Sequence, residues 1–204
     1  MTPYLIAIAG PSGSGKSLFA ELLLEQVKAQ LPNLEVSAIT EDAYYRDQAS
    51  VPVKERDKVN YDHPDALEHD LLAEHLTCLR NGEAVKVPVY DYAVHTRSSQ
   101  VVDVKPTPVI VVEGILLLSN EELRDCFDVC FYLDAPLDVC LVRRLERDTR
   151  ERGRSLESVL EQYCIIETHR RCWGYFRLVL FILHLPFQRR EQLYGIGKFV
   201  AVLS

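Results

Sequence analysis

Apolar positions along the chain follow two patterns, and each pattern predicts one kind of secondary structure. Short continuous apolar runs at residues 4–9, 109–113 and 129–133 are typical of strands buried on both faces of a parallel sheet. Residues 34–39 predict a further short strand. Residues 84–92 and 99–105 alternate between apolar and polar side chains, which predicts an antiparallel pair of strands.

Three longer segments predict helices. In residues 17–30 the apolar positions lie near helical spacing until a proline ends the segment. In residues 65–81 the leucines lie on one side, and Asn81-Gly82 closes the helix. Residues 137–154 are also predicted to be helical and become strongly basic towards their end. Strands that alternate with helices indicate βαβ units with right-handed crossovers, in a single α/β domain spanning residues 1–204.

The composition is ordinary for a globular protein, and it narrows the class of partner. The 204 residues are enough for one domain, and 30 acidic against 23 basic residues give a net charge of −7. This balance argues against a general nucleic-acid-binding surface but leaves room for a local basic site. The six cysteines form no C-x-x-C pair and have no zinc-site spacing.

The chain ends and the apolar runs bear on localisation. The first residues lack the basic region of a signal peptide. The longest apolar run, residues 178–187, is shorter than the about 20 residues that span a bilayer. We therefore expect a cytoplasmic protein with neither a membrane nor a nucleic acid as partner.

One segment between a buried strand and an amphipathic helix carries a complete phosphate-binding motif. Residues 10–17 read GPSGSGKS and fit the pattern G-x-x-x-x-G-K-[ST]. The glycines allow backbone N–H groups to converge on phosphate oxygens, and the helix N-terminus adds partial positive charge. Lys16 would neutralise the β- and γ-phosphates of a nucleotide, and Ser17 would ligate Mg²⁺. The predicted nucleotide-binding residues are Gly10, Pro11, Ser12, Gly13, Ser14, Gly15, Lys16 and Ser17.

Phosphate loops serve GTPases, ATPases and small-molecule kinases, so other residues must separate these classes. The N-K-x-D motif that guanine-specific GTPases carry is absent from the sequence. The strand VIVVEG ends in a single acid, Glu113, where ATP-hydrolysing motors usually carry Asp or Asp-Glu. Glu113 is predicted to hold the metal or its water shell, and the alternative is an exposed acid at a strand end.

Two acidic residues are candidates for the acceptor side. Asp42 follows the second predicted strand, at the carboxyl edge where open α/β sheets bind ligands. Phosphoryl transfer to a hydroxyl needs a carboxylate near the nucleophile, but a loop Asp can equally be a turn or cap residue. Asp62, in the stretch DHP before a helix, is likewise either a ligand-binding acid or, with Asp65, a helix N-cap.

The segment VPVYDYAVHTR brings together Tyr90, Tyr92 and His95. On a strand, Tyr90 and Tyr92 point to the same side. Such rings can stack on a flat ligand and bond to its edge, or they can belong to an aromatic, half-buried strand. From this segment alone both interpretations stay open.

The basic helix also has two interpretations. Its arginines are Arg143, Arg144, Arg147, Arg150, Arg152 and Arg154. Pairs at i,i+4 spacing, which favour an exposed salt-bridged helix, are Glu146–Arg150, Arg147–Glu151 and Asp148–Arg152. An excess of guanidinium groups is also what a lid over phosphates requires, and Gly153 offers a break where such a lid could hinge.

Several motifs together resemble one known family. GPSGSGKS, TEDAYYRD, NYDHPDAL, PVYDYAVHTR, VVEGIL and RRLERDTRERGRSLESVLEQY follow one another in the order found in uridine (uridine–cytidine) kinases, over about residues 4–163. The resemblance implies a three-layer P-loop NTPase-type α/β fold with a mainly parallel sheet. It also implies an inserted nucleoside-binding β-hairpin at 84–105 and an arginine-rich helical lid at 143–163. The implied reaction transfers a phosphoryl group from ATP or GTP to the 5′-hydroxyl of uridine or cytidine, with Mg²⁺.

The resemblance also assigns roles to single residues. Asp42 would be the catalytic base, close to Mg²⁺, and Lys16 and Arg147 would act on the transferred group. The residues implied near the metal are Ser17, Asp42 and Glu113. Arg147 and Arg152 are implied near the triphosphate. The residues implied around the nucleoside are Tyr45, Asp62, Tyr90, Tyr92, His95, Arg144, Arg154 and Gln162. Among these, Asp62 would accept hydrogen bonds from the ribose, Tyr92 would stack on the base, and Tyr90 and His95 would contact its edge. Family members are commonly tetramers, so a homo-oligomer is expected.

The resemblance ends near residue 163. Residues 164–204 carry none of the family markers, which are a Thr-Val-Arg-Pro-like turn, Pro-Ser/Thr-Lys, Ala-Asp and a strand ending in Pro-x-Gly. Residues 176–185 would supply a replacement strand or leave an exposed apolar patch. The alternatives are therefore another small-molecule kinase of the phosphoribulokinase type, or a nucleotide-binding protein whose stability, donor binding or catalysis is impaired by this tail.

Overall fold

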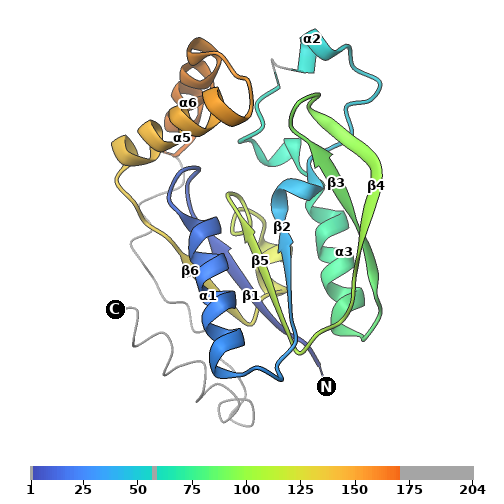
Figure 1. Ribbon diagram of the computed structural model, residues 1–204. Helices are drawn as coiled ribbons and strands as arrows, with labels where there is room; N and C mark the ends of the chain where they lie inside the picture. Colours follow the sequence, from blue (N-terminus) through green and yellow to red (C-terminus); the bar gives the residue numbers. More distant parts are fainter. Residues whose placement is uncertain (1, 57–58, 171–204) are drawn as a thin grey trace.

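A computed structural model describes residues 2–56 and 59–170 and has a parallel sheet at its centre (Figure 1). The sheet has four strands in the order β2–β5–β1–β6. Their bounds are Val36–Thr40 for β2, Val109–Gly114 for β5, Tyr4–Ala9 for β1 and Val129–Tyr132 for β6. The predicted parallel α/β fold is therefore confirmed, and its strands end at the edge where Figure 1 shows α5 and α6.

Helices cover both faces of this sheet, because alternate residues of each strand point to opposite sides. Ile6 and Ile8 pack with Ala20 and Leu23 of α1 (Lys16–Gln30) on one face. On the other face the core contains Leu5 and Ala7 of β1, Leu72 and Leu76 of α3 (His69–Arg80), and Leu123 of α4 (Glu121–Asp125). The result is three layers, with α1 on one side and α3 and α4 on the other.

The predicted antiparallel pair forms beside β2. β3 (Val85–Asp91) pairs with β4 (Thr96–Val104), and the register shifts between Pro88 and Tyr90. The second strand begins at Thr96 and not at the predicted residue 99, because the two strands continue to pair after this shift. Alternation of side chains along the sequence does not reveal pairing after such an irregularity. The turn between the strands contains His95, which has a positive φ of 50°.

The prediction of a helix over residues 65–81 was wrong about where the helix begins. Residues Pro64–Ala66 form a 3₁₀ turn, η2, and the side chain of His63 accepts a hydrogen bond from the Asp65 backbone N–H. Leu67 is then extended and forms an isolated antiparallel bridge with Tyr45, so α3 begins only at His69. This pairing with a distant residue prevails over the helical spacing of the leucines.

The region predicted to be a lid contains two helices, which lie above the carboxyl ends of the strands (Figure 1). α5 spans Leu137–Glu151 and α6 spans Leu156–Arg170, and Gly153 between them has a φ of 63°. The sequence did not predict α6, α4, the short helix α2 (Val53–Arg56) or the 3₁₀ turn η1 (Glu41–Tyr44). In the part of the chain that the structure describes, no helix is both long and apolar enough to cross a membrane. The strand proposed for residues 176–185 lies outside the described residues.

Candidate functional site

The phosphate-binding motif forms the loop between β1 and α1. Gly13 and Gly15 have φ values of 83° and 94°, in the left-handed region that side chains other than glycine rarely adopt. Any side chain at Gly13 would also meet the backbone carbonyl oxygen of Cys140 at 2.4 Å. The loop closes with a hydrogen bond from the Ser14 N–H to the Pro11 carbonyl oxygen at 3.0 Å. Local geometry therefore requires the glycines of this motif, as its sequence predicts.

Lys16 and Ser17 meet Glu113 at the base of the loop. β1 and β5 are neighbours, so the end of β5 lies next to the start of α1. Glu113 Oε2 accepts a hydrogen bond from Ser17 Oγ at 3.1 Å and lies 3.9 Å from Lys16 Nζ. The other oxygen, Oε1, accepts from Thr40 Oγ1 at 2.8 Å. Glu113 is thus not an isolated acid at a strand end but the meeting point of three polar groups.

Asp42 lies in η1, directly after β2. Its backbone N–H donates to Thr40 Oγ1, so Thr40 connects the Asp42 turn to Glu113. Asp42 Oδ2 accepts a hydrogen bond from the Tyr92 hydroxyl at 2.7 Å and lies 3.9 Å from Arg152 Nη2. Among the described residues, none donates a hydrogen bond to Oδ1. One carboxylate oxygen is thus held in place, while the other accepts no hydrogen bond from the part of the chain that the structure describes.

Tyr92 remains a protonated donor in this arrangement. Burial raises the pKa of its phenol well above the ordinary value, and the nearby Asp42 carboxylate raises it further. The guanidinium of Arg152 lies over the Tyr92 ring, 4.2 Å from its centre. Sequence reasoning treated Tyr92 as a stacking ring only and missed its hydrogen bond to Asp42.

The turn that carries Asp42 is fixed from below by a buried carboxyl group. Glu41 is fully buried and bonds His69 Nε2 at 2.9 Å and the Leu116 N–H at 2.8 Å. Burial raises the pKa of Glu41, although its bond with His69 opposes this. A side chain at Gly114 would meet the Glu41 carboxylate at 2.3 Å, so only glycine fits there. Sequence reasoning missed this connection between η1, α3 and the segment after β5.

Aromatic rings gather beside Asp42. Tyr45 lies 5.0 Å from Tyr90 and 5.4 Å from Tyr61, and Tyr90 lies 5.3 Å from Tyr92, measured between ring centres. His95 stacks on Tyr61 at 5.2 Å with an interplanar angle of 19°. The five rings come from three separate segments, so this cluster is a pocket wall and not only an aromatic strand. Tyr61 was missed, since nothing in its local sequence distinguishes it from a core tyrosine.

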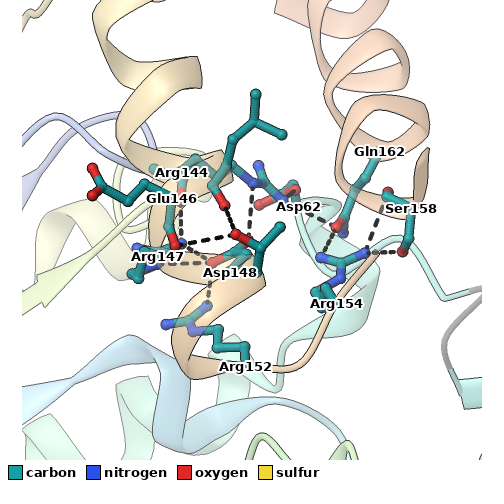
Figure 2. Close-up of polar contacts among 12 residues, drawn as sticks. Asp62, Arg144, Glu146, Arg147, Asp148, Arg152, Arg154, Ser158 and Gln162 are labelled. Carbon is teal, nitrogen blue, oxygen red and sulfur yellow. Dashed lines mark hydrogen bonds and ion pairs between the residues drawn. The ribbon is translucent and has the colours of Figure 1, made fainter. Parts of the chain in front are cut away.

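Asp62 is not a helix cap, because its side chain contacts the lid. Asp62 Oδ2 accepts from Arg144 Nη2 at 2.7 Å, and both side chains are nearly buried. Burial alone would lower the pKa of Arg144, but the carboxylates of Asp62 and Asp148 keep it above the ordinary value. Gln162 Oε1 accepts from Arg144 at 3.0 Å and also from Arg154 Nη1 (Figure 2).

The arginine helix shows both of its predicted faces. On the exposed side Arg150 pairs with Glu146 at 2.5 Å, as i,i+4 spacing predicts. On the inner side Arg147 Nη2 donates to Ser12 Oγ of the phosphate loop at 3.0 Å. Arg143, for which no role was predicted, donates to the Gly13 carbonyl oxygen at 3.4 Å. Arg143 and Arg147 therefore lie over the phosphate loop.

One cavity joins most of the predicted residues. Its lining includes Ser12, Lys16, Asp42, Tyr45, Asp62, Tyr90, Tyr92, His95, Arg144, Arg147, Arg152, Arg154 and Gln162. Tyr61 and Ile115 line it as well and were not predicted. Ser17 and Glu113 are not part of this lining, but Glu113 is connected to it by its ion pair with Lys16 and accepts a hydrogen bond from Ser17. Within residues 2–56 and 59–170, no group of three or more His, Cys, Asp or Glu side chains forms a metal cluster.

Comparison with known proteins finds a family whose sequences match this chain. The family model described as Phosphoribulokinase / Uridine kinase family matches residues 5–170. The chain is 53% identical to a uridine kinase of Aeromonas hydrophila subsp. hydrophila over 159 residues, which are 78% of this chain and 74% of that protein. It is 50% identical to a uridine kinase of Vibrio cholerae over 159 residues, covering 78% of this chain and 75% of the relative.

Solved structures with much lower sequence identity share the fold. A phosphoribulokinase of Rhodobacter spheroides matches 82% of this chain and 65% of its own, with a TM-score of 0.64 and 14% identity. A D-glycerate 3-kinase of Cryptococcus neoformans matches 80% of this chain and 77% of its own, with a TM-score of 0.58 and 18% identity. At these identities the matches show the three-layer kinase fold and nothing finer.

Proposed function

The chain belongs to the phosphoribulokinase / uridine kinase family, and from this premise we propose that it is a uridine kinase. It transfers the γ-phosphoryl group of a nucleoside triphosphate to the 5′-hydroxyl of uridine or cytidine. The observation that carries the proposal is the single cavity in which Lys16, Asp42, Asp62 and the aromatic rings meet. The phosphate donor site and a site for a flat acceptor that carries hydroxyl groups thereby lie within reach of one carboxylate, that of Asp42.

The donor end consists of the phosphate loop and the inner arginines. The backbone N–H groups of the loop and the start of α1 provide partial positive charge for the phosphates. Lys16, whose side chain is largely buried beneath the cavity, adds a full charge. Arg147 and Arg152 approach from α5 and its end, where they stabilise the charge that develops on the transferred group.

The residues at Glu113 fit a magnesium ion. Two adjacent ligands of an octahedral Mg²⁺, each about 2.1 Å from the ion, lie about 3 Å apart. Ser17 Oγ and Glu113 Oε2 are 3.1 Å apart, which suits this geometry directly or with water in one position. Ser17, Glu113 and Asp42 would hold the ion, which when bound neutralises phosphate charge.

Asp42 would orient the 5′-hydroxyl and accept its proton as the oxygen attacks phosphorus. Tyr92 and Arg152 both contact Oδ2, whereas none of the described residues donates to Oδ1, so this oxygen can receive the substrate hydroxyl. Asp62 lines the same cavity, against Arg144, and would accept bonds from the ribose hydroxyls. The ribose would lie between these two acids, and the rings of Tyr45, Tyr90 and Tyr92 would hold the base that projects from it.

A phosphoryl-acceptor panel tests the proposal. The protein is incubated with Mg²⁺ and ATP or GTP, and ADP or GDP release is measured with uridine, cytidine, deoxycytidine, adenosine and ribulose 5-phosphate. We expect release with uridine and cytidine. Release with ribulose 5-phosphate alone would instead favour a phosphoribulokinase-type activity. Nucleotide binding without acceptor-dependent release would contradict the kinase proposal and favour a binding protein.

Replacing His95 by Asn tests the acceptor pocket. Asn tolerates the positive φ at this position, so the change removes the ring that stacks on Tyr61 without straining the turn. We expect KM for uridine to rise by about 10-fold, the value of one or two lost contacts, while KM for ATP stays unchanged. Steady-state kinetics with each substrate varied in turn measures both values. An equal rise of both KM values would mean that His95 supports the fold and not the base.

A further inference from the structure

Asp148 is a buried acid on the inner face of α5 that the proposed mechanism does not use. Its side chain is 1% exposed, and three arginines surround its carboxylate (Figure 2). Arg147 contacts Oδ1 at 2.8 Å and Arg152 approaches the same oxygen at 3.8 Å. Arg144 Nε lies 3.4 Å from Oδ2. A buried carboxylate needs such compensation, and here one acid receives it from three cations.

The same three arginines extend to three different parts of the cavity. Arg147 reaches Ser12 at the donor end, at 3.0 Å. Arg152 lies over Tyr92 and 3.9 Å from Asp42, where transfer would occur. The third, Arg144, reaches Asp62 at the acceptor end, at 2.7 Å. One carboxylate is therefore in contact with three guanidiniums that reach the donor end, the transfer point and the acceptor end of the cavity.

The main chain of Asp148 is engaged as well. Its carbonyl oxygen accepts a hydrogen bond from the Arg154 N–H at 3.0 Å, just after Gly153 reverses the chain with a φ of 63°. Arg154 then bonds Gln162 and Ser158 of α6. The end of α5 and the start of α6 are thus held at the residue that also gathers the arginines.

The charge balance gives this arrangement a purpose beyond stability. Asp148 shares its one negative charge among three guanidiniums, two of which also face Asp62 and Asp42, so its main effect is to fix the direction of each side chain. Preorganised cations cost little reorganisation when charge develops in a transition state. Flexible arginines with the same net charge would bind phosphate equally well but would lack that direction.

We propose that Asp148 is a positioning residue that orients Arg144, Arg147 and Arg152 towards acceptor, phosphate loop and transfer point. It does so without contacting either substrate. The inference rests on the proposed kinase function for its kinetic part. Its binding part concerns only the charge and direction of the arginines and is measured without turnover.

The test compares Asp148→Asn with Glu146→Gln, a control on the exposed face of the same helix, where Glu146 pairs only with Arg150. For Asp148→Asn we expect kcat with uridine to fall by about 10- to 100-fold, the range attributed to lost orientation of catalytic groups. Its affinity for inorganic tripolyphosphate, measured by calorimetry, should tighten by about 3- to 10-fold because one nearby negative charge is gone. Glu146→Gln should change neither value.

Two results would overturn the proposal. Unchanged kcat in Asp148→Asn would show that the arginines need no anchor, and weaker tripolyphosphate binding together with lower kcat would indicate a purely structural role.

A second variant pair covers the case in which Asp148→Asn alone does not fold. Asp148→Asn is then added to the variant Arg147→Gln, which already has less positive charge around the lost carboxylate. There, adding Asp148→Asn should lower kcat by about fivefold more through Arg144 and Arg152, and no further loss would again contradict the proposal. A failure of wild-type uridine turnover would contradict the kinase function, but the tripolyphosphate comparison would remain valid.

Discussion

Asp42→Asn is expected to reduce kcat with uridine by about 10³-fold or more while the affinity for ATP stays within about twofold of wild type. The amide keeps the size of the carboxylate and can still accept the Tyr92 hydroxyl, so the pocket should keep its shape. It cannot accept a proton from the substrate hydroxyl, and the attacking oxygen is then a weaker nucleophile. Single-turnover ADP formation and a separate ATP-binding titration measure the two quantities.

Asp103→Asn is the matched control for this experiment. Asp103 is an exposed aspartate on β4, away from the cavity lining, and its replacement removes the same charge from the chain. It should leave both kcat and ATP affinity unchanged. A drop of less than about tenfold in Asp42→Asn would assign Asp42 to positioning, since general-base catalysis contributes at least about 100-fold. Loss of ATP binding would instead show that Asp42 acts mainly through the Mg²⁺ of the donor and not through proton transfer.

The apolar runs predicted the sheet well because its central strands, β1 and β5, are buried on both faces. Every residue of such a strand must be apolar, so the pattern does not depend on any distant partner. Ile6 and Val111 illustrate this, since both enter the core next to α1. The phosphate loop was predictable for a related reason, because its glycines are required by local backbone geometry at Gly13 and Gly15.

Long-range contacts explain what the sequence did not show. The start of α3 shifted because Leu67 pairs with Tyr45. The bond between Tyr92 and Asp42 joins residues that are 50 positions apart, and no spacing rule describes it. Within α5, the i,i+4 rule predicted the exposed pair Glu146–Arg150 but gave no sign that Asp148 is buried.

The structure also explains why one helix supported two interpretations. A salt-bridged surface helix and an arginine lid need the same residue types at the same spacing, and they differ only in what faces the protein. α5 does both, because its outer face carries Arg150 with Glu146 while Arg147 faces the phosphate loop. Its composition alone therefore supports both interpretations, and only the packing of α5 over the loop separates them.

Asp62→Asn is expected to raise KM for uridine by about 100-fold or more and to reduce the preference for uridine over 2′-deoxyuridine. A carboxylate that accepts two ribose hydroxyls makes two charge-assisted hydrogen bonds, each contributing about 1.5–3 kcal/mol. Deoxyuridine lacks one of these bonds and leaves the nearly buried Asp62 carboxylate with one hydrogen bond fewer, which is the source of discrimination. The amide is neutral, so both the binding energy and the penalty for the deoxy sugar become smaller.

Kinetics with uridine and 2′-deoxyuridine at fixed ATP measures this effect, and a melting curve monitors the pair with Arg144. Removing one partner of a buried ion pair typically costs about 3–5 kcal/mol, but Asn keeps an acceptor oxygen for Arg144 Nη2, so a smaller loss of stability is expected. Asp65→Asn is the control, since Asp65 lies three positions further along with its side chain 91% exposed. If Asp62→Asn discriminates against deoxyuridine as strongly as the wild type does, the ribose is recognised elsewhere and Asp62 serves only to hold Arg144 in the lid.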